Sequence, residues 1–183
     1  MRTQTHITLL VVLSSLLAAC GTGSFGTDVP PETVFDDATP EDLSDLCVAI
    51  SNELLALATG PVTRTICTAA GVLVDSAAIS CGEVRSECVN EAPPPEVTSC
   101  DNINANAFDA CDTTVGELET CMNELRANVR RLEDQVSCSM TRSELALVDA
   151  DDLYPALCTQ IGIECPALGM LLQFDVDLET TAD

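Results

Sequence analysis

Residues 115–136 read VGELETCMNELRANVRRLEDQV, and this stretch decides the fold class. Its apolar residues recur at alternating steps of three and four, which is the spacing of one face of an α-helix. These residues are Val115, Leu118, Met122, Leu125, Val129, Leu132 and Val136. Thr114 and Glu117 match a capping box, which predicts the start of the helix. The same face could form a coiled-coil dimer, but three heptads are short for that, so we expect an intramolecular bundle.

Two more helices are expected before this one. Thr39-Pro40 followed by two acidic residues is a typical helix start, because Thr can cap, Pro fits the first turn and acids favour the positive end of the helix dipole. The apolar face of the first helix holds Leu43, Leu46, Cys47, Ile50, Leu54 and Leu57. Gly60-Pro61 predicts its end. A second helix is expected from Thr63, and the pattern leaves open whether it continues to Glu91 or breaks at residues 80–82.

The remaining segments also favour short helices. We expect one over residues 99–111, one through residues 145–148, one over residues 153–161 and an apolar run over residues 168–174. The acidic end of the chain is expected to fray. The sequence therefore predicts an all-α fold, a bundle of four to six amphipathic helices within one domain over residues 40–183.

The N-terminus resembles a bacterial lipoprotein signal. Arg2 precedes an apolar run that ends in Leu17-Ala18-Ala19-Cys20, and the run is too short for a permanent membrane span. This ending is similar to the lipobox, which implies cleavage before Cys20, covalent lipid on its thiol and a signal peptide over residues 1–19. The resemblance covers only these first twenty residues. An ordinary signal peptide with an incidental cysteine is the alternative.

Residues 20–39 are expected to form the lipidated cysteine and a flexible tether, since they are rich in Gly, Thr, Ser, Pro and Asp and lack periodicity. In lipoproteins of two-membrane bacteria, an Asp after the lipidated cysteine is associated with inner-membrane retention. Gly21 stands at that position, so the resemblance implies a cell-envelope protein anchored in the outer membrane.

Ten cysteines remain besides Cys20, and an even number in an exported chain predicts up to five disulfides. They are Cys47, Cys67, Cys81, Cys88, Cys100, Cys111, Cys121, Cys138, Cys158 and Cys165. No two are spaced as Cys-x-x-Cys, which disfavours zinc, iron–sulfur and thiol-exchange sites. Cys88 and Cys100 flank Pro93-Pro94-Pro95, and this pair is our single best expectation for a disulfide.

Composition excludes several classes of function. The chain carries 30 acidic residues against 7 arginines, has no Lys or Trp, and has a single histidine, His6, inside the expected signal peptide. Histidine-based catalysis, imidazole metal sites and lysine chemistry are therefore excluded from the mature protein. The negative charge also disfavours nucleic acid and leaves basic proteins or divalent cations as partners. Half of the mature arginines lie within residues 126–131, where Arg130 is spaced to pair with Glu133 and Asp134.

Acidic residues could in principle bind calcium or hydrolyse glycosides, but neither pattern is complete. The triplets Asp149, Asp151, Asp152 and Asp175, Asp177, Glu179 lack the glycine and glutamate of an EF-hand loop. Glycosidases also need aromatic platforms for sugars, and this chain has few aromatic residues. We therefore expect no cofactor, no metal site and no catalysis, but a structural or partner-binding lipoprotein. A cation- or ligand-binding envelope module is the alternative.

Overall fold

The computed structural model describes residues 27–76, 78–93, 100, 103–150 and 153–172. The fold is all-α, as predicted. The helices are α2 (Pro40–Leu57), α3 (Thr63–Val74), α4 (Cys81–Glu91), α5 (Val115–Gln135), α6 (Arg142–Leu145), α7 (Ala156–Glu164) and α8 (Pro166–Leu171). Short 3-10 segments are η2 (Phe35–Asp37) and η4 (Ala105–Phe108), and η3 (Ala58–Val62) is a π-helical segment. In the described ranges, the only pairing of β type is an isolated bridge between Val34 and Thr114.

The predicted break at Gly60-Pro61 is confirmed, since α2 ends at Leu57 and α3 begins at Thr63 as expected. The two helices are nevertheless joined through η3, so that they form one kinked helix from Pro40 to Val74. Pro61 has no N–H to donate and Gly60 takes non-helical angles (φ −100°, ψ −105°), so the helix widens into η3 there. Threonine side chains satisfy carbonyl groups around the kink. The Thr63 hydroxyl donates to the carbonyl of Ala58 at 2.6 Å. Counting this helix once, the described part has six α-helices, within the predicted range.

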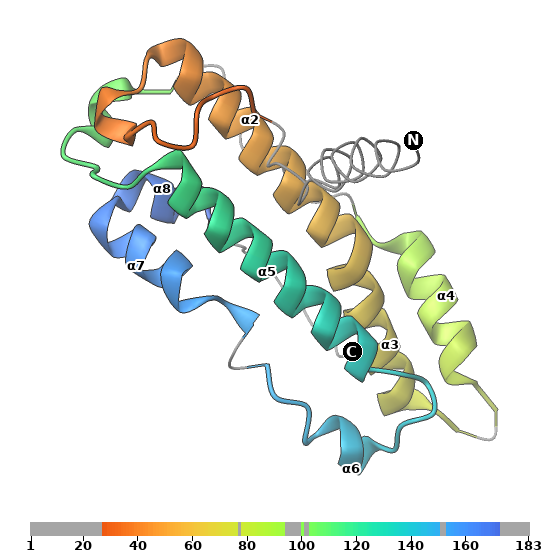
Figure 1. The fold of residues 1–183 in the computed structure, drawn as a ribbon. Helices are drawn as coiled ribbons and strands as arrows, with labels where there is room; N and C mark the ends of the chain where they lie inside the picture. The colour runs from red at the N-terminus through yellow and green to blue at the C-terminus, as the bar shows by residue number, and fades with distance from the viewer. Residues whose placement is uncertain (1–26, 77, 94–99, 101–102, 151–152, 173–183) are drawn as a thin grey trace, which may run out of the picture.

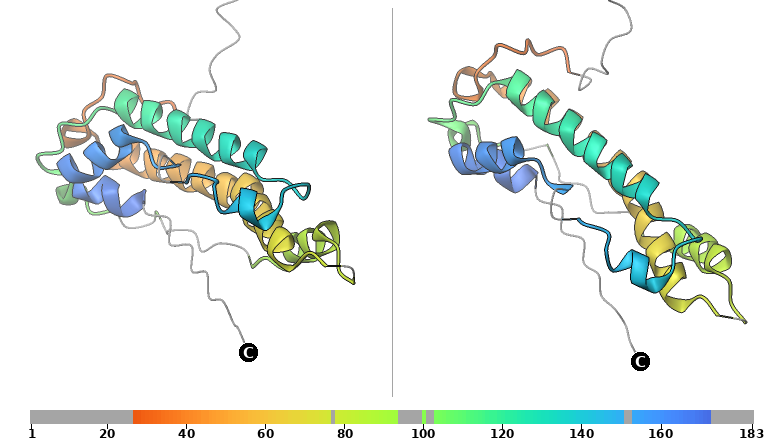
Figure 2. Two further views of the ribbon diagram at one scale, coloured as in Figure 1. Left: turned by 90° about the horizontal axis from the view of Figure 1, so that it is seen from below. Right: turned by 60° about the horizontal axis from the view of Figure 1, so that its bottom comes forward.

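The long kinked helix and α5 lie side by side and run in the same direction (Figures 1 and 2). A parallel pair needs a long return connection, and α4 with the chain leading to residue 114 provides it. The α7–α8 hairpin packs near the N-terminal ends of the pair, whereas α4 and α6 lie at the opposite end. We call that opposite end, made of α3, α4, residues 136–138 and α6, the distal end.

The apolar face predicted for residues 115–136 is the centre of the core. Val115, Leu118, Met122, Leu125 and Val129 are buried together with the apolar residues of α2, α7 and α8. This face is therefore covered within the molecule, which confirms the intramolecular bundle. Thr114 and Glu117 also form the predicted capping box: the Glu117 backbone N–H donates to Thr114 Oγ1 at 3.2 Å, and Thr114 N–H donates to the Glu117 carboxylate at 2.8 Å.

The tether expected over residues 20–39 differs from the structure in its second half. Val29 and Phe35 are only 6% and 1% exposed, and the Phe35 ring stacks on Phe108 at 5.8 Å between centroids. The backbone N–H of Val115 and that of Gly116 also donate to carbonyl groups of residues 33 and 31. Residues 29–38 are thus part of the folded body. Residues 20–26 lie outside the described part.

Some other boundaries also differ from expectation. The chain breaks between α3 and α4, and Ser80 caps α4 with a capping box to Glu83, which settles the open question at residues 80–82. Residues 105–108 form a 3-10 turn in place of the helix expected over 99–111. Helix α7 continues through Gly162, which permits close contact with Gly169 on α8.

Candidate functional site

All ten cysteines outside the signal region form disulfides, giving the predicted number of five bridges. The pairs are Cys47–Cys100, Cys67–Cys88, Cys81–Cys138, Cys111–Cys165 and Cys121–Cys158. The expected Cys88–Cys100 pair is wrong. Cys88 turns toward Cys67 because α4 packs back on α3, and Cys100 reaches Cys47 on α2. Cys20, the predicted lipidation site, lies outside the described residues.

Four of the five bridges fall into two groups by burial. Cys111–Cys165 joins the loop before α5 to the α7–α8 junction, and Cys121–Cys158 joins α5 to α7. All four of these residues are at most 2% exposed and belong to the apolar core. By contrast, Cys67–Cys88 and Cys81–Cys138 hold the distal end, and each has one partner at or near the surface.

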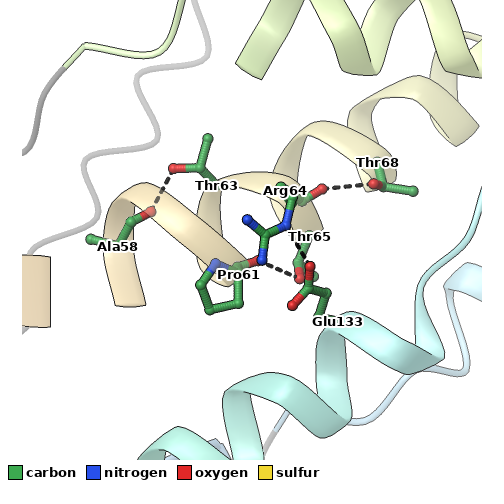
Figure 3. Close-up of polar contacts among 7 residues, drawn as sticks. All are labelled: Ala58, Pro61, Thr63, Arg64, Thr65, Thr68 and Glu133. Carbon is green, nitrogen blue, oxygen red and sulfur yellow. Dashed lines mark hydrogen bonds and ion pairs between the residues drawn. The ribbon is translucent and has the colours of Figure 1, made fainter. Parts of the chain in front are cut away.

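Two arginine–glutamate ion pairs join the parallel helices. Arg126 Nε of α5 lies 2.7 Å from Glu53 Oε1 of α2, and both side chains are 21% exposed. Arg64 Nε of α3 lies 2.6 Å from Glu133 Oε1 of α5 (Figure 3). The partners are 73 residues apart in the first pair and 69 in the second. On the long helix, η3 and the kink lie between Glu53 and Arg64.

Glu133 is the electrostatic centre of the distal end. The hydrogen bond from Arg64 lowers the pKa of Glu133, and the positive charges of Arg64, Arg85 and Arg130 add to this effect. Positive charges from α3, α4 and α5 therefore act on one carboxylate, and Arg64 contacts it directly. The pairing of Arg130 with Glu133 within α5 was predicted, but the direct bond comes from Arg64, which sequence spacing could not reveal.

An open groove of about 480 Å³ lies between the end of α5 and the α6 region. Its lining residues are Arg131, Gln135, Met140, Glu144, Leu147, Val148 and Asp149. The Leu147 side chain is 83% exposed and, with Met140 and Val148, supplies the apolar wall. Glu144 is engaged by the backbone N–H and hydroxyl of Thr141, which lowers its pKa. Nothing in the sequence pattern indicated this groove.

The acidic triplets are only partly placed. Asp149 lines the groove, whereas Asp151, Asp152, Asp175, Asp177 and Glu179 lie outside the described residues. Within the part of the chain that is described, no three His, Cys, Asp or Glu side chains are arranged to hold a metal ion.

The helix Pro40–Val74 is long and apolar enough to cross a bilayer by length and composition. Its most apolar face packs inward: Leu43, Leu46, Ile50 and Leu57 are at most 3% exposed. Two disulfides and two ion pairs also fasten this helix to the rest of the chain. Burial accounts for these four apolar residues, whereas 28% of the most apolar 18-residue window of the helix is buried.

Comparisons with known proteins add no relative. No family model matches the chain, no curated protein matches it, and no solved structure matches its fold.

Proposed function

We propose that this protein is a non-catalytic, lipid-anchored lipoprotein of the cell envelope with a structural or partner-binding role. The observation that supports this best is the joint presence of a lipobox-like Leu17-Ala18-Ala19-Cys20 and a body cross-linked by five disulfides. Disulfides persist in oxidising compartments outside the cytosol, where lipoproteins are displayed. The two features agree on the compartment although they use different cysteines.

The folded body would sit close to its anchor. Among the described residues, which begin at residue 27, Val29 is the first in the core, and eight positions (21–28) separate it from Cys20 in the sequence. Fully extended, eight residues span at most about 28 Å. The N-terminal ends of α2 and α5 would then face the membrane, and the distal end would point away from it. Because Gly21 follows the lipidated cysteine, the outer membrane is the membrane we propose.

A partner would meet a strongly acidic surface. The formal net charge of −23 favours basic proteins and disfavours anionic surfaces. The groove between α5 and the α6 region offers exposed apolar side chains beside Glu144 and Asp149, which suits an amphipathic basic segment.

Intact mass of the protein purified from native membranes, before and after reduction, tests the proposal. We expect a chain that begins at Cys20 with added acyl mass and a further gain of two hydrogens per disulfide on reduction. Cys20→Ala should move the protein out of the membrane fraction, whereas Ser24→Ala should leave it there. Gly21→Asp should shift it toward the inner membrane. An unmodified chain that begins at Met1 would contradict the proposal.

The cation-binding alternative has its own test. Millimolar calcium should leave the melting temperature unchanged if the acidic surface is only solvated. A rise of several degrees would instead support a divalent-cation-binding module.

A further inference from the structure

The two ends of the molecule are held together by different forces. The main apolar core takes residues from the long kinked helix only as far as Val62 and from α5 only as far as Val129. Helices α3, α4 and α6 contribute no residue to it. Of the residues in α4, only Cys81 is buried. The distal end therefore lies outside the main core, and its own buried apolar residues are Cys67, Val72, Cys81 and Val136.

Two disulfide bonds, rather than a shared apolar core, hold α4 to the rest of the molecule. Cys67–Cys88 ties α4 to α3, and Cys81–Cys138 ties its first residue to the chain just after α5. Cys88 is partly exposed and Cys138 is exposed, so each distal bridge has one residue accessible to a reagent in solution. Cys100 of the Cys47–Cys100 bridge is also partly exposed. The core bridges Cys111–Cys165 and Cys121–Cys158 offer no such access, since their cysteines are at most 2% exposed.

The contact between α3 and α4 is close and depends on a missing side chain. A Cβ at Gly71 would lie 2.6 Å from the carbonyl oxygen and 2.8 Å from the Sγ of Cys81. Thr68 lies in the same contact, with its carbonyl oxygen 3.7 Å from Cys81 Sγ. Small side chains permit close approach but bury little apolar area, so they stabilise the contact weakly.

We propose that α4 is a releasable arm that a dithiol reductant frees from α3 while the rest of the bundle stays folded. A thiolate of the reductant attacks Cys138 Sγ, the bond to Cys81 breaks, and the Cys81 thiolate takes up a proton. The second thiol of the reductant then closes its own disulfide and releases Cys138 as a thiol. The same exchange at Cys88 releases Cys67. Each bridge consumes two electrons from one dithiol, and release uncovers the small-residue face of α3 around Gly71.

This proposal is independent of the lipid anchor and can be tested on the mature body in solution. Limited treatment with dithiothreitol, followed by alkylation and mass mapping, should modify Cys67, Cys81, Cys88 and Cys138 before the four core cysteines. Hydrogen exchange of the partly reduced protein should show protection over residues 81–91 falling by about tenfold or more, with protection in α5 unchanged.

A variant in which Cys67, Cys81, Cys88 and Cys138 are all changed to Ser lacks both distal bridges. It tests the release of α4 without adding a reductant. We expect it to lose protection over residues 81–91 and to keep protection over residues 115–129. Unchanged protection in α4 would overturn the proposal, because the arm would then dock without its bridges. Loss of protection in α5 would also overturn it, because the distal end and the core would then unfold as one unit.

Discussion

The backbone N–H of Phe35 donates to the carbonyl oxygen of Thr113 at 3.0 Å, which ties the segment before α2 to the segment before α5. The N–H of Asp36 extends this contact to the carbonyl of Cys111, and Val34 bridges to Thr114. The starts of both parallel helices are thereby fixed to each other.

The Thr113 hydroxyl at this junction is buried and has no hydrogen-bond partner among the described residues. Thr113→Val replaces the hydroxyl with a methyl group of similar size and should raise the free energy of unfolding by about 1 kcal/mol. Urea denaturation measures this. Thr68→Val is the matched control, because the buried Thr68 hydroxyl donates to the carbonyl of Arg64 at 2.6 Å. A gain in the control as large as that at Thr113 would contradict this explanation.

Gly169 permits the close packing of α8 on α7. A Cβ there would lie 3.0 Å from both the Cα and the carbonyl oxygen of Gly162, which are backbone atoms that cannot rotate away. Gly169→Ala should therefore lower the free energy of unfolding by about 1–3 kcal/mol. Gly82→Ala in α4 is the control, since a Cβ there meets nothing within 4 Å. It should be neutral or stabilising, because Ala favours helix more than Gly.

The capping box at the start of α5 should contribute measurably to stability. Thr114→Ala removes the acceptor of the Glu117 N–H and should cost about 1 kcal/mol. Thr120→Ala, on the same helix, removes an exposed hydroxyl that only donates to the carbonyl of Gly116. Its effect should stay within about 0.5 kcal/mol. Thermal unfolding of the two variants measures this difference. Equal losses of stability in Thr114→Ala and Thr120→Ala would contradict a role for the cap.

The Arg64–Glu133 pair predicts a pH dependence. The pKa of Glu133 is lower in the folded protein than in the unfolded chain, where it is about 4.3. The pairing therefore stabilises the fold above that value, and its contribution is lost as the pH falls through the folded-state pKa. Glu133→Gln should lower stability at pH 7 and flatten the decline on acidification. Glu124→Gln, an exposed change on α5, should leave the decline as in the natural protein. The measurement is urea unfolding between pH 3 and 7.

The buried core bridge should matter most for global stability. Cys121–Cys158 closes a loop with a sequence separation of 37, which corresponds to about 4 kcal/mol in the chain-entropy model. Cys121→Ala with Cys158→Ala should lower the free energy of the main unfolding transition by that order. In the same model Cys81–Cys138, with a sequence separation of 57, would contribute at least as much if the distal end unfolded together with the core. We expect Cys81→Ala with Cys138→Ala to lower the free energy of the main transition less, because the distal end shares little of the core and opens separately. Calorimetry of both pairs distinguishes the two cases.

Periodicity in the sequence was sufficient to predict α5, its cap, the start of α2 and the fold class, because these depend on residues close together in the chain. The continuation through Gly60-Pro61 was not predictable from local signals. Packing on α5 and the threonine hydrogen bonds around η3 keep the two halves as one helix. Val29 and Phe35 lacked any periodic pattern, so their burial against Phe108 and the start of α5 could not be read from spacing.

The site was less predictable than the fold. The number of disulfides followed from an even cysteine count, but each bridge joins residues separated by 21 to 57 positions. Pairing therefore depends on how the helices pack, and ten cysteines allow many connectivities. The groove could not be predicted for the same reason, because Arg131 and Leu147 come together only when the chain after α5 turns back.

The parallel arrangement of the long kinked helix and α5 also constrains how the protein folds. Glu53 and Arg126 meet although 73 residues separate them, so α2 has no partner for its apolar face until α5 is available. Non-local contacts of this kind slow folding, because the entropy of closing a long loop is lost before the contacts contribute any favourable free energy. The N-terminal half should thus remain unassembled until α5 is available, which makes late collapse a property of this topology.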